Sequence, residues 1–169
     1  MDKRLAIARE IPRLRRFARA LVRDRAAADD LVQDCLETGL ARMHQLREPE
    51  KCRQWLFAIL RNRFHDRQRR SVREPELTSL EENEGSAMAV QSDLLVFLTA
   101  SEALDSLPAE QREVLALVAV EGCSYREAAD ILGIPDGTLM SRLSRARERM
   151  RAMLEVPAPR GGHLRSIKP

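Results

Sequence analysis

The sequence predicts an all-α protein made of two small helical domains joined by a flexible acidic linker. Apolar residues recur every three or four positions in several separate segments, which is the spacing of amphipathic helices. Only one Trp, one Tyr and four Phe occur among the 169 residues, and β-branched runs are few, so a sheet protein is disfavoured. Residues 74–93 contain Glu, Pro, Gly and Ser but neither Lys nor Arg, which is typical of a linker between domains.

Two amphipathic helices open the predicted first domain, residues 5–73. The first covers residues 5–22, and Pro12 can break or restart it. Asp24 is suited to cap the second helix, which is expected to run to about Met43. The packing stripe of this second helix should contain Val32, Leu36, Leu40 and Met43. Its acidic side has no accompanying His, so a solvated or protein-binding face is favoured over a catalytic or metal site.

A polar loop, residues 44–53, leads into a third helix over residues 54–71. The first half of this helix is broadly apolar and should form the buried centre of the domain. Its second half and the residues just after it carry six Arg against the single carboxylate of Asp66. Such charge beside Asn62 suits contacts to phosphates and bases. The alternative is a basic helix end that only favours the helix dipole.

The predicted second domain, residues 94–155, begins with a Leu-rich helix. Pro108 should occupy the first position of the following helix, and Gly122 should end it. Residues 156–169 are rich in Pro and Gly and are predicted to be a disordered tail.

The stretch from Ser124 to Arg151 predicts two short helices joined by a tight turn. Ser124 and Glu127 have the spacing of a capping box at the start of the first helix. Gly133 can take the left-handed conformation that ends this helix, and Asp136 can cap the next one. The second helix then carries an apolar stripe of Leu139, Leu143, Ala146 and Met150. This is the pattern of a helix-turn-helix, whose second helix enters the DNA major groove.

A polar, basic face of this second helix is the predicted base-reading surface. At about 100° per residue, one side of the helix collects Thr138, Ser141, Arg142, Arg145 and Arg149, roughly opposite the apolar stripe. The planar fork of Arg matches guanine edges and phosphate oxygens. A basic helix can also be merely solvated, but two caps, the turn and the stripe occur here in register, which favours DNA binding.

The sequence also argues against several other functions. Cys35, Cys52 and Cys123 form no CxxC pair and have no His at ligand spacing, so neither a zinc site nor disulfides are expected. The sequence offers no nucleophile-base pair and no Gly-rich phosphate loop, so we expect no enzyme, no cofactor and no small-molecule substrate. It has neither a signal peptide nor a long apolar segment, which predicts a cytoplasmic protein without membrane insertion.

Four segments together resemble the extracytoplasmic function sigma factors, the short two-domain class of bacterial sigma factors. They are DDLVQDCL (29–36), WLFAILRNRFHDRQRR (55–70), LDSLPAEQREVLAL (104–117) and the helix-turn-helix run (125–149). The resemblance implies that the first domain is region 2, which binds core RNA polymerase and opens the −10 element. It also implies that the second domain is region 4, which binds the −35 element, and that an anti-sigma factor is a partner.

Site residues follow from the resemblance by position. The polymerase-binding residues would be Asp29, Asp30, Gln33 and Asp34. The −10 element would be met by Asn62, Arg63, Asp66, Arg67 and Arg70. The −35 element would be met by Thr138, Ser141, Arg142, Arg145 and Arg149. The loop at residues 46–53 would hold an extruded base of the non-template strand, and the acidic linker would follow the RNA path of the polymerase or act as a plain spacer.

Two departures and two alternatives accompany this hypothesis. Met140 stands where the family often has Lys or Arg, and the 46–53 loop lacks the Phe-Arg-Gly type of sequence that relatives share. One alternative is a helix-turn-helix regulator that binds DNA without polymerase, although the sequence shows no dedicated dimerisation helix. The other is a sigma mimic that sequesters an anti-sigma factor through protein contacts alone.

Overall fold

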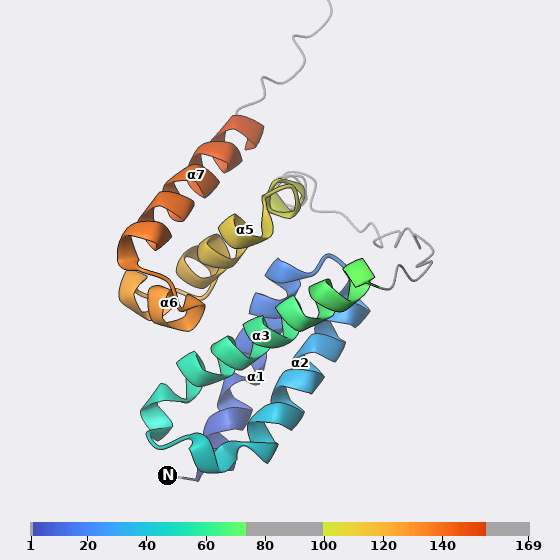
Figure 1. The fold of residues 1–169 in the computed structure, drawn as a ribbon, viewed down its shortest axis with the longest axis vertical. Coiled ribbons are helices and arrows are strands. Elements are labelled where there is room, and N and C mark those ends of the chain that lie inside the picture. The colour runs from blue at the N-terminus through green and yellow to red at the C-terminus, as the bar shows by residue number, and fades with distance from the viewer. Residues whose placement is uncertain (1, 74–99, 155–169) are drawn as a thin grey trace, which may run out of the picture.

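The computed structural model describes residues 2–73 and 100–154, and within these ranges it is helical, with no strand (Figure 1). The first helical unit contains α1 (Lys3–Leu21), α2 (Arg25–Ala41) and α3 (Cys52–Arg73), and the second contains α5 (Ala109–Leu115), α6 (Tyr125–Leu132) and α7 (Asp136–Leu154). The all-α prediction is therefore confirmed. The predicted linker at residues 74–93 and the tail at 156–169 lie outside the described residues.

Helix α1 is continuous through Pro12, so the proline, which could have broken or restarted the helix, does neither. Asp2 caps the helix by accepting a hydrogen bond from the Arg4 backbone N–H at 2.9 Å. Proline removes one backbone donor, but Pro12 and Ala8, whose carbonyl loses that donor, are both exposed, so water can replace the bond. Packing of the buried face then keeps the helix intact.

Helices α1, α2 and α3 enclose an apolar core in which the Phe17 and Phe57 rings lie 5.1 Å apart between centroids. The Asp24 cap is confirmed, since its carboxylate accepts from the Ala27 N–H at 2.6 Å. Leu40, however, is 49% exposed, so its predicted place in the stripe is wrong. Gly39 lies at the contact with α3 instead, since a Cβ added at this residue would lie only 3.0 Å from Leu56 Cδ2.

The connection between α2 and α3 contains two short 3₁₀ turns, Met43–Gln45 and Pro49–Lys51. Leu46 lies between them and is almost fully buried, which anchors an otherwise polar loop to the bundle. Helix α3 starts at Cys52, two residues earlier than the sequence predicts, because the second 3₁₀ turn leads directly into it.

The second unit packs α5 against α7 around Val114, Leu117 and Leu139, all of which are fully buried. Pro108 caps α5 from the preceding position rather than occupying the first turn, since α5 begins at Ala109. The backbone continues past α5 as a π-helical turn, Ala116–Val120, and ends near Gly122, whose φ is 65°. The prediction that Gly122 ends this segment is confirmed.

The predicted helix-turn-helix is confirmed, with a difference at the start of its second helix. The Ser124 and Glu127 side chains form the complete capping box, and Gly133 ends α6 in the left-handed region with φ of 61°. Asp136 is the first residue of α7 rather than its cap, because the Pro135 carbonyl already accepts from the Leu139 N–H at 3.0 Å. Tyr125, the first residue of α6, is 43% exposed.

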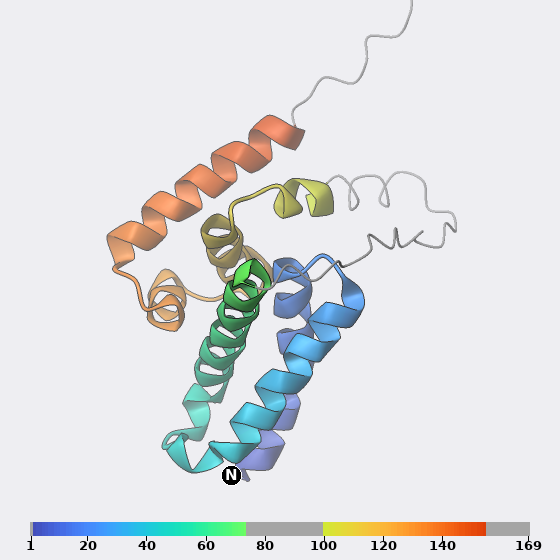
Figure 2. The ribbon, with the colours of Figure 1, turned by 45° about the vertical axis from the view of Figure 1, so that its right-hand side comes forward.

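The two units lie against each other, as both views show (Figures 1 and 2). Helix α3 contacts α6, and α1 contacts α5 and the π-helical turn. The buried apolar residues of both units form one contiguous cluster. No local sequence pattern indicates this contact.

Candidate nucleic-acid interface

Helix α7 divides its side chains between the core and the surface. Leu139, Leu143 and Ala146 are buried, as predicted. Ser141, Arg145 and Arg149 are exposed and are therefore available to a ligand. Ser141 Oγ donates to the carbonyl of residue 138 at 3.0 Å, a bond that it can exchange for one to DNA.

Two of the five predicted −35 residues do not share that exposure. Thr138 is only half-exposed, and Arg142 packs against α5, where its Nη2 lies 2.9 Å from Glu110 Oε2. Arg142 is three positions from Leu139 and one from Leu143, so it lies on the flank of the buried stripe and not opposite it. The placement of all five residues on one face opposite the stripe is therefore wrong for Arg142.

The other flank of α7 holds a group that the sequence analysis did not assign. Met140, Ser144 and Arg147 lie here with Tyr125 of α6 around an open hollow of about 330 Å³. Arg147 Nη1 lies 3.5 Å from the Tyr125 hydroxyl, which joins the two helices of the motif. The helical angle from Leu139 would have shown that this flank faces outward.

The basic half of α3 shows a similar division. Asn62 and Arg70 are exposed, but Arg63 donates two hydrogen bonds to Thr38 Oγ1, at 3.1 and 2.8 Å. Arg67 pairs with Asp34 through its Nη2 at 2.6 Å. The predicted −10 residues therefore do not form one free surface.

The pair of Arg67 and Asp34 joins two predicted sites. Asp34 was assigned to polymerase binding, whereas Asp29, Asp30 and Gln33 on the same helix are exposed. Because both partners are only partly buried, this ion pair is weak enough to exchange for an external ligand. On α3 itself, Asp66 pairs with Arg69 at 2.6 Å, which holds its carboxylate beside the basic surface.

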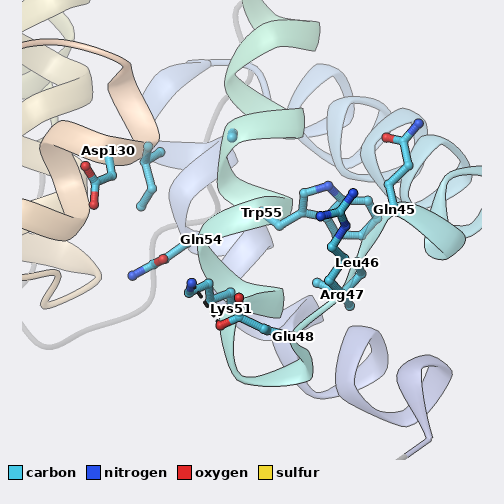
Figure 3. A pocket seen from close by; sticks show the side chains of 10 residues that line it. Gln45, Leu46, Arg47, Glu48, Lys51, Gln54, Trp55 and Asp130 are labelled. Carbon is cyan, nitrogen blue, oxygen red and sulfur yellow. Dashed lines mark ion pairs between the residues drawn. The ribbon is translucent and has the colours of Figure 1, made fainter.

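The 46–53 loop lines a second hollow, of about 340 Å³ (Figure 3). Leu46, Arg47 and Trp55 line it from the loop and the start of α3, and Asp130 approaches from α6 on the far side. The hollow therefore lies between the two units. An aromatic ring beside polar and cationic groups is the combination that stacks and hydrogen-bonds an unpaired base.

Four ion pairs and one contact of a His side chain with a carboxylate join the two units, and we call these five pairs the interdomain clasp. Their basic groups belong to the first unit and their acidic groups to the second. The pairs are Arg16 with Glu121 at 3.1 Å, Arg23 with Asp105 at 3.0 Å, Arg53 with Glu127 at 3.0 Å, Arg61 with Glu113 at 3.0 Å, and His65 with Glu113 at 2.8 Å.

Two carboxylates of the clasp, Glu113 and Glu121, are buried. Burying a carboxylate is costly unless cations and hydrogen bonds compensate it. Arg61 and His65 both approach Glu113, and Arg16 meets Glu121 with two nitrogens at 3.1 and 3.2 Å. Each buried charge is thus matched across the boundary between the units.

Glu127 belongs to both the helix-turn-helix and the clasp. Its Oε2 accepts from the Ser124 backbone N–H at 2.8 Å, while its Oε1 accepts from Arg53 and Gln54. The hydrogen bonds from the Ser124 backbone and hydroxyl, with smaller contributions from Gln54 and Arg53, lower the pKa of this carboxyl from 4.5 to about 2.

The described residues hold no cluster of three or more His, Cys, Asp or Glu side chains that could bind a metal. Burial raises the pKa of the Cys35 thiol to about 12 and also raises the pKa of Cys52 and Cys123. Over the same ranges, no helix combines the length and apolar character needed to span a membrane.

Family comparisons match both units. Residues 7–61 match the family described as "Sigma2 domain of PhyR", and residues 98–150 match "Sigma-70, region 4". The ECF RNA polymerase sigma factor EcfG of Rhodopseudomonas palustris is 40% identical over 152 residues, covering 86% of this chain and 81% of EcfG. The ECF RNA polymerase sigma factor SigM of Bacillus subtilis is 30% identical, covering 82% of this chain and 86% of SigM.

A solved structure agrees with these relatives. The sigma factor RpoE of Bartonella quintana, crystallised with the anti-sigma factor NepR, superposes with a TM-score of 0.73 at 32% identity. The match covers 92% of this chain and 98% of that one.

Proposed function

This chain belongs to the ECF RNA polymerase sigma factors, and from that membership we propose how its surfaces divide the work of promoter recognition. The sigma factor binds core RNA polymerase and directs it to promoters during transcription initiation. It performs no catalysis of its own and acts in the cytoplasm, where polymerase and promoter DNA meet. The domain limits we propose are residues 5–73 for region 2 and 94–155 for region 4.

The observation that carries the −35 assignment is the exposed face of α7. Its buried stripe fixes the helix on the second unit, while Ser141, Arg145 and Arg149 face outward. The helix-turn-helix presents such a face to the major groove, where the first turns reach bases and later residues reach phosphates. Arg145 is therefore our main base-reading residue and Arg149 a phosphate contact. Arg142 reaches DNA only after it leaves Glu110.

The −10 element meets the distal half of α3. Asn62 and Arg70 are exposed in the present arrangement and can bind DNA directly. Arg63 and Arg67 join them by exchanging Thr38 and Asp34 for phosphates. This exchange is feasible because the two Arg side chains and Asp34 are only half-buried, although Thr38 is buried. The residues Asp29, Asp30 and Gln33 on the neighbouring helix are exposed and accessible to the polymerase, with Gln33 donating a hydrogen bond to Glu37 at 3.1 Å.

The hollow beside the 46–53 loop receives the extruded base of the non-template strand. Trp55 offers a ring for stacking, and Arg47 and Gln54 offer donors for the base edge or its phosphate. Because Asp130 and Ile131 of α6 line the same hollow, the two units must separate for a strand to enter along its length.

An anti-sigma factor is the proposed regulatory partner. The Bartonella quintana relative was crystallised with NepR, and CnrH, which is 28% identical with a TM-score of 0.65, was solved with the cytosolic domain of CnrY. The family description that matches the first unit also names PhyR, and PhyR of Bartonella quintana is an anti-anti-sigma factor that was crystallised with NepR. A sigma mimic therefore stays the second candidate. A mimic would bind the anti-sigma factor but would not support transcription.

Run-off transcription with purified core polymerase tests the proposal. Wild-type protein should start transcription at specific promoters selected from a genomic library. Arg145→Ala should weaken binding to the −35 element by about 1 to 3 kcal/mol and reduce −35-dependent transcription accordingly. Asn62→Ala should weaken promoter opening. Arg9→Ala, an exposed charge on α1, is the matched control and should have little effect.

The outcome separates the three functions. Absence of any specific transcript, together with tight binding to an anti-sigma factor, would establish a mimic instead. A sequence-specific footprint by the protein without polymerase would favour the independent regulator. Transcription that is unchanged by Arg145→Ala and Asn62→Ala would refute the assigned surfaces while leaving the family membership intact.

A further inference from the structure

The recognition helix exposes an apolar side chain near its N-terminus. Met140 is the fifth residue of α7 and is 56% exposed, the largest exposed fraction among the big hydrophobic side chains of the described residues. The apolar positions that hold α7 in place are already filled by Leu139 and Leu143, so Met140 is not needed for packing. An exposed thioether near the start of the recognition helix can contribute to ligand binding, because apolar surface gains free energy when it is removed from water.

The surroundings of Met140 favour DNA as that ligand. Its neighbours Ser141 and Ser144 on the outward side are small, so another molecule can approach the helix closely. The exposed charges that follow on α7 are four cations against one carboxylate: Arg145, Arg147, Glu148, Arg149 and Arg151. This balance suits a polyanion and disfavours a basic or purely apolar protein surface.

We infer that Met140 is a specificity-determining residue that contacts the 5-methyl group of a thymine in the −35 major groove. The inference rests on the proposed function, since it requires α7 to lie in that groove. A thioether cannot donate a hydrogen bond, so it gains nothing from the acceptors N7 and O6 of guanine. The thymine methyl is the apolar group that the major groove offers.

Arg147 and Tyr125 fix the depth at which Met140 meets the base. The two polar ends lie 3.5 Å apart across the hollow beside Met140. A phosphate bound between them would set the position of the DNA backbone against both helices of the motif. Met140 then projects past this contact toward the base edges.

The first experiment identifies the preferred −35 sequence by selecting promoters from a randomised library with the full chain and core polymerase. Each thymine of the preferred −35 element is then replaced by deoxyuridine, which lacks the methyl group, in one duplex at a time. Binding of each duplex to the complete holoenzyme is measured by competition. One replacement should weaken wild-type binding about fourfold, the value for one buried methyl-sized group.

Variants connect this loss to Met140. Met140→Ala should bind thymine and deoxyuridine duplexes equally, Met140→Leu should keep most of the discrimination, and Met140→Arg should shift selection at that position toward guanine. Leu154→Ala is the matched control, because Leu154 is also an exposed apolar residue of α7 but lies at its far end. It should leave the thymine preference unchanged.

Two results would overturn the inference. One is that no deoxyuridine replacement affects wild-type binding; the other is that the methyl preference persists in Met140→Ala. Weaker binding of an anti-sigma factor by Met140→Ala, with an unchanged thymine preference, would assign the residue to a protein interface instead. Failure of the wild-type holoenzyme to select any −35 sequence would refute the proposed function and is distinct from these outcomes.

Discussion

Replacing Glu113 with Gln should destabilise the folded chain by removing the central charge of the interdomain clasp. The Glu113 carboxylate is 1% exposed and lies 3.0 Å from Arg61 and 2.8 Å from His65. Glutamine keeps the shape of the side chain but carries no charge, so Arg61 would be left without its counterion. Both Arg61 and His65 come from the first unit, so the change acts across the boundary.

The expected cost follows from how far each partner is buried. Removing one member of a fully buried ion pair costs about 3 to 5 kcal/mol, because the remaining charge stays buried without compensation. The Arg61 side chain keeps 22% of its exposure and His65 keeps 30%, so water can solvate part of the charge left behind. We therefore expect a loss of about 2 kcal/mol, which for a chain of this size lowers Tm by about 4 to 8 °C.

Glu110→Gln provides a matched control on the same helix. Glu110 also pairs with an Arg, at 2.9 Å from Arg142, but its side chain is 65% exposed. An exposed pair contributes at most about 1 kcal/mol and often nothing measurable. Calorimetry or circular dichroism of both variants compares the two sites, and small-angle scattering reports whether the units separate in Glu113→Gln.

Equal losses of stability in the two variants, or unfolding of Glu113→Gln at the temperature of the wild type, would contradict the expected cost of an uncompensated buried charge. A double replacement of Glu113 and Arg61 by Leu adds a further check. If the cost of the single change comes from an uncompensated charge, the double variant should recover most of the lost stability. A double variant that is less stable than Glu113→Gln alone would show that the ion pair of Arg61 and Glu113 stabilises the fold more than two apolar side chains do.

Three further predictions concern packing, pH and thiol chemistry. Gly39→Ala should lower the free energy of unfolding, measured in urea, by about 1 kcal/mol. The new Cβ would lie 3.0 Å from the buried Leu56, and this overpacking outweighs the better helix propensity of Ala. The control Gly137→Ala has open space around it and should be neutral or stabilising. The pKa of Glu127 is lowered from 4.5 to about 2, so its stabilisation is complete above pH 4.5 and declines as the pH falls toward 2; Glu127→Gln should flatten this part of the stability profile, and an unchanged profile would contradict the assignment. Burial raises the pKa of Cys35 to about 12, so a thiol reagent at pH 8 should label it only after denaturant is added, as mass spectrometry of the labelled peptide can show.

The sequence predicted the helices well because their signals are local. The capping box of Ser124 and Glu127, the left-handed Gly133 and the Asp24 cap each depend on residues within a few positions of one another. The errors also have local causes. Pro12 stays inside α1 because its exposed side can be solvated, and Leu40 leaves the stripe because Gly39 allows α2 to approach α3 at that turn.

The candidate interface was predictable only in part. Periodicity shows which side of α7 is buried, and Arg145 and Arg149 are exposed as that argument requires. It cannot show which exposed-side arginines are already bound within the protein. Arg142 finds Glu110 on another helix, and Arg67 finds Asp34, 33 positions away in the sequence. Such long-range pairs depend on packing that no local pattern encodes.

The clasp couples DNA binding to the arrangement of the two units. Promoter elements that lie apart on DNA can be held by two weak contacts on one chain, and the linked affinity exceeds either contact only when both can form together. In the present arrangement Arg53 and Arg61 of α3 are paired with Glu127 and Glu113 of the second unit, so these two arginines are not free to bind DNA. A nucleic-acid backbone offers these arginines the same kind of partner that the second unit supplies. DNA bound along α3 would replace the glutamates as partners of these arginines, and separation of the units would expose the arginines to DNA. DNA binding and separation of the two units therefore favour each other.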